Sequence, residues 1–230
     1  MALSRQKLRR QDAILDAAEQ LVREHGATNF SMLALSAKAE LSPATPYNLF
    51  GNKASILYAL LNRSLDGIFE GAQRVAVVPD PIDKVLIAAA QAGAFFVADP
   101  DYYRPLYQYL LGVIDPVHRP AYMNRALDYW RAALEGFECR KVLSRNQCDV
   151  LARGIVAHVV GVLDFWIHGD LDDDFFSPLL EHGVVLLIFH IADGDQRERL
   201  SKRMADLSER LRDMPPLGSA QTKAIGGGAR

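Results

Sequence analysis

The sequence predicts an all-α protein, in which a small helical domain at the N-terminus precedes a larger helical domain. Apolar residues recur at intervals of three and four along nearly the whole chain, which is the spacing of one helix face. No segment shows the alternation of a half-buried strand, and half of the 230 residues are hydrophobic, which is ample for a core. We expect residues 1–52 to form the first domain, 53–214 the second, and 215–230 a disordered tail.

The N-terminal domain begins with an amphipathic helix, whose apolar face comprises Ile14, Ala17, Ala18, Leu21 and Val22. Gly26 follows it at the position of a C-terminal cap. Ser31 is the expected N-cap of a second helix, in which Leu35 and Ala39 face inward. A short third helix follows a turn, and Asn52 caps a long, apolar fourth helix.

Turn residues divide the remainder of the chain into further helices. Residues 77–81 read as a linker or turn, and Pro81 suits the first turn of the helix that follows. Asp99–Asp101 should break that helix, and Ser144 should cap a long one. Gly169–Asp174 reads as a solvated acidic loop. The expected helices are 81–98, 102–111, 119–138, 144–168, 178–193 and 196–214.

Charge and cysteine content restrict the class of protein. A net charge of −2 argues against a protein that coats nucleic acid through bulk charge. Cys139 and Cys148 are too few for a disulfide framework and lack metal-ligand spacing, so a reducing cytoplasm fits and no metal is expected. Four basic residues nevertheless crowd the N-terminus, where they form either a solvated tail or an arm for DNA phosphates or the minor groove. They are Arg5, Lys7, Arg9 and Arg10.

Two apolar stretches bear on membrane insertion. Ile155–Ile167 and Gly183–Ala192 are interrupted or short, whereas a bilayer span takes ~20 apolar residues. The basic start leads into an amphipathic segment rather than a signal peptide. We therefore expect both stretches to be buried helices and predict no membrane partner.

Residues 31–53 predict a helix-turn-helix, the unit that places a second short helix in the DNA major groove. Leu35, Ala39 and Leu41 supply packing between its helices, Ser42 is a suitable N-cap, and Pro43 fits the first helical position. The candidate DNA-binding residues are Ser31, Ser42, Ala44, Thr45, Tyr47, Asn48 and Lys53.

Each candidate suits a different part of the duplex. Thr45 can bond a base or offer its methyl group to thymine, and Asn48 can pair with adenine. The Tyr47 hydroxyl suits a phosphate, the alternative being core packing. Lys53 opposes the dipole of the fourth helix at a cost of ~0.3–1 kcal/mol. A phosphate at that helix terminus would explain it, and a chance surface charge is the alternative.

Residues 6–61 resemble the N-terminal domain of TetR-family transcriptional regulators. That family has a capped helix, a turn and a short helix ending in Tyr-x-His-Phe-x-x-Lys, which is similar to Ser31 through Tyr47-Asn48-Leu49-Phe50-Gly51-Asn52-Lys53. Three residues depart from the pattern. Glu40 replaces the glycine of the turn, Leu49 replaces histidine or tyrosine, and Pro46 lies inside the recognition helix, so that the helix could instead start there with Thr45 as its cap.

The resemblance implies that the larger domain dimerises and binds a ligand. Residues 144–168 are apolar nearly all round, so one face can meet the core and another a partner subunit, with Gly154 and Gly161 allowing close approach. A fully buried helix in a monomer is the alternative. The predicted interface residues are Val156, Val160, Leu163, Val184, Leu187 and Ile191.

The middle helices are rich in aromatic residues, which form either a core or a ligand pocket. Buried tyrosines need hydroxyl partners, and a pocket with a few convergent polar groups would supply them. His158 is either a core histidine or a group that orients a ligand. The predicted ligand residues are Phe95, Tyr103, Tyr107, Tyr129, His158 and Phe165.

These features predict a cytoplasmic, homodimeric TetR-like regulator. Its expected partners are double-stranded operator DNA and a small apolar or aromatic effector that releases a repressor from the operator; no cofactor is expected. A transcriptional activator and a ligand-independent DNA-binding protein are the alternatives. An enzyme or carrier with an incidental helix-turn-helix has no nucleophile–base spacing, metal motif or glycine-rich phosphate loop in its favour.

Overall fold

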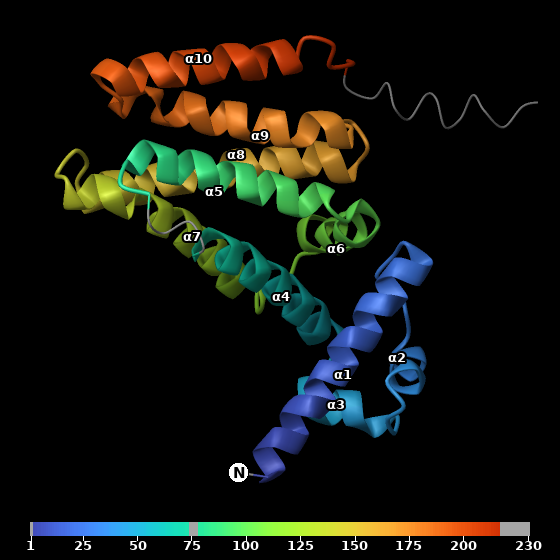
Figure 1. Ribbon diagram of the computed structural model, residues 1–230. Coiled ribbons are helices and arrows are strands. Elements are labelled where there is room, and N and C mark those ends of the chain that lie inside the picture. Colours follow the sequence, from blue (N-terminus) through green and yellow to red (C-terminus); the bar gives the residue numbers. More distant parts are fainter. Residues whose placement is uncertain (1, 74–77, 217–230) are drawn as a thin grey trace, which may run out of the picture. The chain divides into compact units, whose positions relative to one another are not determined.

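The computed structural model describes residues 2–73 and 78–216, and within these ranges every regular element is a helix, so the all-α prediction is confirmed (Figure 1). The elements are α1 (Ala2–His25), α2 (Met32–Lys38), α3 (Ala44–Phe50), α4 (Lys53–Gln73), α5 (Pro81–Val97), α6 (Pro100–Gly112), α7 (Arg119–Cys139), α8 (Arg145–Ile167), α9 (Asp173–Ile188), η1 (Phe189–Ile191) and α10 (Gly194–Arg210).

The helices gather into two compact units. Among the described residues, the N-terminal unit comprises 2–66 and 101–123, and the C-terminal unit comprises 67–73, 78–100 and 124–216. The N-terminal unit therefore takes in most of α4, most of α6 and the start of α7 as well as α1 to α3. A functional boundary after residue 52 stays a prediction.

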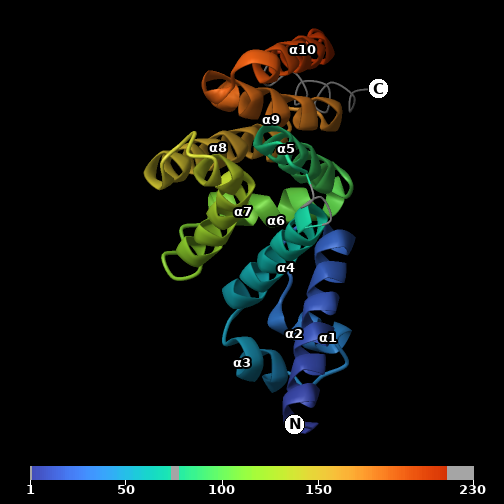
Figure 2. The same ribbon diagram turned by 60° about the vertical axis from the view of Figure 1, so that its left-hand side comes forward.

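In the N-terminal unit, α1 packs against both short helices, as Figures 1 and 2 show. Ile14, Ala18 and Val22 of α1 are fully buried, as the apolar periodicity predicts. Leu35 of α2 is fully buried as well. The basic residues near the N-terminus lie on the exposed first turns of α1 rather than in an extended arm.

The turn after α2 is left-handed at a residue that carries a side chain. Glu40 has φ 55°, its N–H donates to the Ala37 carbonyl at 3.1 Å, and the Leu41 N–H donates to the Ser36 carbonyl at 2.9 Å. These two bonds form the Schellman motif, whose left-handed position is usually glycine. Glutamate therefore accepts the ~1–2 kcal/mol penalty of a left-handed L-residue.

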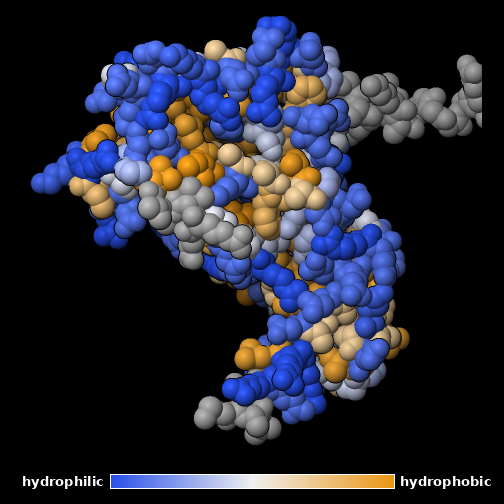
Figure 3. All heavy atoms as spheres, viewed as in Figure 1, coloured by the Kyte–Doolittle hydropathy of each residue, from blue (hydrophilic) through white to orange (hydrophobic). Residues whose placement is uncertain are grey.

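In the C-terminal unit, α9 is the central helix, with α5, α8 and α10 packed against it. Gly93 of α5 permits close packing on α9, since a Cβ there would lie 2.9 Å from the Ser177 hydroxyl. The buried carboxylate of Glu181 accepts two hydrogen bonds from the Arg203 guanidinium, at 2.6 and 2.8 Å. This bidentate pair ties α10 to α9, and the outer surface over α10 is largely hydrophilic (Figure 3).

Most helix ends agree with the cap residues identified from the sequence. Ser144 accepts the Gln147 N–H in a capping box at the start of α8, and Pro81 is the first residue of α5. The acidic loop is shorter than expected, because α9 begins at Asp173 and accommodates Pro178 within the helix. The predicted tail, from residue 217 onward, and Val77 of the predicted linker lie outside the described residues.

Two segments, Arg145–Ile167 and Asp173–Ile191, are long and apolar enough to cross a membrane by length and composition alone. Both are core helices of the C-terminal unit, where α8 and α9 pack on each other. Glu181 lies within the second segment and is paired with Arg203, which is the arrangement of a helix buried in protein.

Candidate nucleic-acid interface

The recognition helix α3 begins at Ala44, which settles the position of Pro46. Pro46 is the third helical residue, where a backbone N–H would have no partner within the helix, so the proline removes no bond. The predicted side-chain cap at Ser42 is wrong, and so is the alternative start at Pro46 with Thr45 as cap. The Ser42 and Thr45 hydroxyls instead hydrogen-bond each other at 2.8 Å, while the Thr45 N–H donates to the Ser42 carbonyl at 2.9 Å.

Three of the candidate contact residues share the exposed face of α3. Ala44, Tyr47 and Asn48 are three and four residues apart and are all exposed, whereas Thr45 is half-buried. Tyr47 is 52% exposed, which disfavours core packing as its role. The Asn48 amide and the Tyr47 hydroxyl are thus the polar groups that α3 presents to a partner.

Ser31 is exposed and uses its hydroxyl to cap α2, accepting the Ala34 N–H at 3.0 Å. The cap confirms the local structural prediction. A contact between Ser31 and DNA stays a prediction.

Lys53 is the first residue of α4, and its ammonium lies 4.6 Å from the centroid of the Phe30 ring. Burial lowers the pKa of Lys53. A cation over an aromatic face gains ~0.5–1 kcal/mol, which offsets the cost of a cation at a helix N-terminus. The contact with Phe30 therefore offsets part of the cost of placing Lys53 at a helix N-terminus, a cost that the sequence alone assigned to a bound phosphate. Phe30 also holds the ammonium at the N-terminal end of α4, directly after α3.

The predicted ligand residues fall in different parts of the fold. Tyr103 and Tyr107 belong to the N-terminal unit, whereas the other four belong to the C-terminal unit. The Tyr107 hydroxyl lies 2.8 Å from that of Tyr122, and the Tyr129 hydroxyl donates to the Ala88 carbonyl at 2.8 Å. Both hydroxyls thus have protein partners, so neither requires a ligand.

The remaining ligand candidates lie on helices of the C-terminal unit. The His158 imidazole packs over Gly183 and bonds the Leu180 carbonyl at 3.0 Å, the arrangement of a core histidine. Phe165 is 38% exposed, and Phe95 packs against Gly67. Surface hollows on the described residues include one of about 870 Å³ along α7 and α8 and one of about 370 Å³ at the α6–α7 loop. None of the six candidates lines either of them.

The predicted interface residues divide between core and surface. Leu163 and Val184 are buried inside the C-terminal unit, so their side chains already have partners within one chain. Val156, Val160, Leu187 and Ile191 are half-buried. Large apolar side chains that the sequence analysis did not single out are also exposed on these two helices, namely Val150 and Leu186. Periodicity alone could not find them, because α8 and α9 are apolar on more than one face.

The described residues hold no cluster of three or more histidine, cysteine, aspartate or glutamate side chains able to bind a metal. Cys139 and Cys148 are free thiols, and burial raises the pKa of Cys148.

The fold and the exposed recognition helix define a helix-turn-helix protein. Residues 14–60 match the family of bacterial regulatory proteins known as the tetR family. The match spans α1 from Ile14, both short helices and the start of α4, so the resemblance drawn from the sequence is confirmed there. The N-terminal domain is therefore a tetR-family domain. No curated protein matches the chain.

Solved structures share the fold at low sequence identity. A TetR-family transcriptional regulator from Syntrophomonas wolfei has a TM-score of 0.65 at 20% identity, covering 78% of this chain and 95% of that chain. SmeT, the repressor of the Stenotrophomonas maltophilia multidrug efflux pump SmeDEF, has a TM-score of 0.57 at 22% identity, covering 79% and 87%. A gamma-butyrolactone receptor (ArpA like protein) has a TM-score of 0.55 at 16% identity, covering 89% and 98%.

Proposed function

We propose that this regulator is a homodimeric, cytoplasmic repressor that binds operator DNA through α3 and leaves it when a small, mostly apolar ligand binds the larger domain. The observation that carries the proposal is the exposed face of α3, which presents Ala44, Tyr47 and Asn48 from a tetR-family domain. An exposed amide and phenol on a recognition helix suit DNA better than they suit catalysis.

The roles on α3 follow from side-chain chemistry. The Asn48 amide donates and accepts, so it can bond adenine N6 and N7 together. Ala44 has only a methyl group, which permits close approach and contact with a thymine methyl. The Tyr47 hydroxyl and the Lys53 ammonium serve phosphates, which fix register without reading sequence. Thr45 remains part of the set, with its hydroxyl shared with Ser42.

Dimerisation is supported by the surface of α8 and α9. Val150, Phe165 and Leu186 are large apolar side chains exposed on this surface. Gly161 of α8 has open space at its Cβ position, which would allow the backbone of a partner helix to approach. Pairing through this surface would give the two-fold symmetry that a reader of two half-sites needs.

Repression and ligand release draw support from what the similar proteins are said to be. SmeT is described as a repressor, and another similar structure is described as a gamma-butyrolactone receptor. A ligand that binds one of two conformations more tightly would lower operator affinity through that difference. The aromatic side chains of the C-terminal unit, Phe95 and Tyr129 among them, fit an apolar ligand better than a charged one.

Binding-site selection from random duplexes tests the proposal. The wild-type chain should enrich a two-fold symmetric sequence with half-site centres about 10 base pairs apart, one helical turn. Asn48→Ala should relax preference at one position per half-site, whereas Lys53→Ala should weaken all sequences alike. Enrichment of no sequence, at a salt concentration where the protein binds DNA, would overturn the DNA-reading role.

A further inference from the structure

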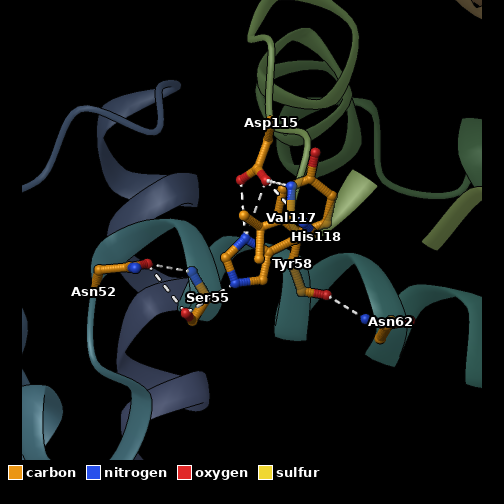
Figure 4. A network of polar contacts seen from close by, with 7 residues as sticks. All are labelled: Asn52, Ser55, Tyr58, Asn62, Asp115, Val117 and His118. Carbon is orange, nitrogen blue, oxygen red and sulfur yellow. Dashed lines mark hydrogen bonds and ion pairs between the residues drawn. The ribbon is translucent and has the colours of Figure 1, made fainter. Parts of the chain in front are cut away.

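A hydrogen-bonded chain joins the loop between α6 and α7 to the first turn of α4, within the N-terminal unit (Figure 4). The side-chain amide oxygen Oδ1 of Asn52 caps α4 by accepting the Ser55 N–H at 2.8 Å and the Ser55 hydroxyl at 3.1 Å. The same hydroxyl lies 3.1 Å from Nε2 of His118. Nδ1 of His118 lies 2.9 Å from a carboxylate oxygen of Asp115, which completes the chain.

Asp115 is held ionised by the loop around it. Its carboxylate accepts the backbone N–H groups of Val117 at 2.9 Å and His118 at 2.7 Å. The hydrogen bond from the His118 N–H is the largest cause that lowers the pKa of Asp115. An ionised carboxylate only accepts hydrogen bonds, so Nδ1 of His118 must carry a proton. The tautomer of the neutral ring is therefore fixed, with a lone pair on Nε2 facing Ser55.

The protonation state of His118 then sets the direction of the bonds that reach α4. With a neutral ring, the Ser55 hydroxyl can give its single proton either to Nε2 or to Asn52. With an imidazolium ring, Nε2 donates to Ser55, and the hydroxyl proton is directed to Asn52. Protonation of His118 thus strengthens the cap of α4, because His118 then donates to Ser55 and Ser55 donates to Asn52.

Tyr58 holds the imidazole in place from the next turn of α4. Its ring stacks on that of His118 with a centroid distance of 5.2 Å and an interplanar angle of 18°. Tyr109 of α6 and Tyr122 of α7 pack edge-on against Tyr58 at 6.1 and 6.3 Å. The His118 side chain is 27% exposed and that of Asp115 is 10% exposed, so solvent still reaches the ring.

We propose that Asp115 and His118 are positioning residues for DNA binding: they fix the first turn of α4, which carries Lys53, and a proton on His118 tightens that hold. The proposal rests on the proposed function, since Lys53 matters here as a phosphate contact. Ser55 lies two residues after Lys53, so the chain of bonds ends on the turn that carries the ammonium. An imidazolium there also adds positive charge near the phosphate.

Charged and titratable groups face His118 from the elements packed around it. Asp115 has a lowered pKa, and burial followed by the charge of Asp115 raises the pKa of Tyr58 to about 12. Burial also raises the pKa of Tyr109. Tyr122 and Arg119 of α7 also lie near this group, where both interact with Tyr58. Histidine is the side chain whose charge ordinarily changes between pH 5 and 8.

The test measures the affinity of the full-length chain for its selected duplex by fluorescence anisotropy at pH 6 and pH 8. His118→Phe keeps the ring that stacks on Tyr58 and removes both nitrogens. His118→Phe and Ser55→Ala should each weaken binding at pH 6 by about tenfold, and the double variant should be no weaker than either. Ser201→Ala is the matched control, because that hydroxyl donates to the Arg197 carbonyl of its own helix in the C-terminal unit, and the variant should bind DNA as the wild-type chain does.

The pH dependence separates positioning from a general loss of structure. Wild-type affinity should rise several-fold from pH 8 to pH 6, and His118→Phe should remove most of that rise. Asp115→Asn keeps a side-chain oxygen that can accept the Val117 and His118 N–H groups, so the chain should remain folded. This variant should reduce the gain in affinity between pH 8 and pH 6, and it replaces His118→Phe if that variant misfolds. If the wild-type chain binds the selected duplex and every variant binds it with an affinity within twofold of the wild type, the positioning proposal is wrong and the proposed function stands. If the wild-type chain binds the selected duplex no more tightly than an unrelated duplex, the proposed function itself is wrong.

Discussion

Replacing Glu40 by glycine should stabilise the N-terminal unit. Glu40 occupies the left-handed position of the Schellman motif after α2, with φ 55°, and its side chain is exposed. A left-handed L-residue costs ~1–2 kcal/mol, because its Cβ approaches the following carbonyl oxygen. Glycine removes that cost but loses about 0.5–1 kcal/mol through the greater freedom of the unfolded chain. The net gain should be about 1 kcal/mol in the free energy of unfolding.

Urea and thermal unfolding, followed by circular dichroism, measure this gain. A change of about 1 kcal/mol corresponds to an increase of about 2–4 °C in the melting temperature of a chain of this size. Glu40→Ala is the control, because it removes the carboxylate and keeps the Cβ that causes the strain. Alanine should therefore gain much less than glycine.

Lys141 provides an independent repeat in the C-terminal unit. It has φ 57° at the end of α7, where its N–H donates to the Glu138 carbonyl and the Val142 N–H donates to the Phe137 carbonyl, both at 3.0 Å. Lys141→Gly should give a similar gain. Equal stability of the glycine and alanine variants at both positions would refute the assignment of strain to the left-handed backbone.

Three further predictions concern packing, pairing and acid sensitivity. Gly183→Ala should destabilise the chain by about 1–3 kcal/mol in urea unfolding, because its Cβ would lie 2.1 Å from the His158 ring; unchanged stability would contradict the close packing of α8 on α9. Gly161→Leu should shift sedimentation from dimer to monomer without unfolding the chain, since nothing lies within 4 Å of its Cβ position in a single chain; a persistent dimer would exclude this surface. The stability that Asp115 adds should be lost as pH falls below about 4, because its folded pKa lies below the unfolded value. Asp115→Asn should thus make the free energy of unfolding depend less steeply on pH below about 4, and an unchanged pH dependence would contradict a stabilising role for the Asp115 carboxylate.

The sequence predicted correctly those features that depend on residues close together along the chain. Ser31 and Ser144 cap their helices as predicted, because a cap needs only a side-chain oxygen and an N–H three residues on. The start of α9 was missed, because Pro178 favours a helix start by local rules while the packing of α9 extends the helix to Asp173.

Features that depend on packing lay beyond the sequence. An apolar stretch does not say which face meets the core, so Leu163 was assigned to a subunit interface although the fold buries it. Phe30 beneath Lys53 was missed, since no sequence spacing signals a ring under that ammonium. His118 and Ser55 are 63 positions apart, so only the fold brings the two together.

The most direct test of sequence-specific DNA binding is an anisotropy titration of the selected duplex and of a scrambled duplex at one salt concentration. Two chains should bind each selected duplex, at least about 10³-fold more tightly than the scrambled one. Asn48→Ala should reduce that ratio while leaving affinity for the scrambled duplex unchanged. Equal affinity of the wild-type chain for both duplexes would contradict a role for α3 in reading bases.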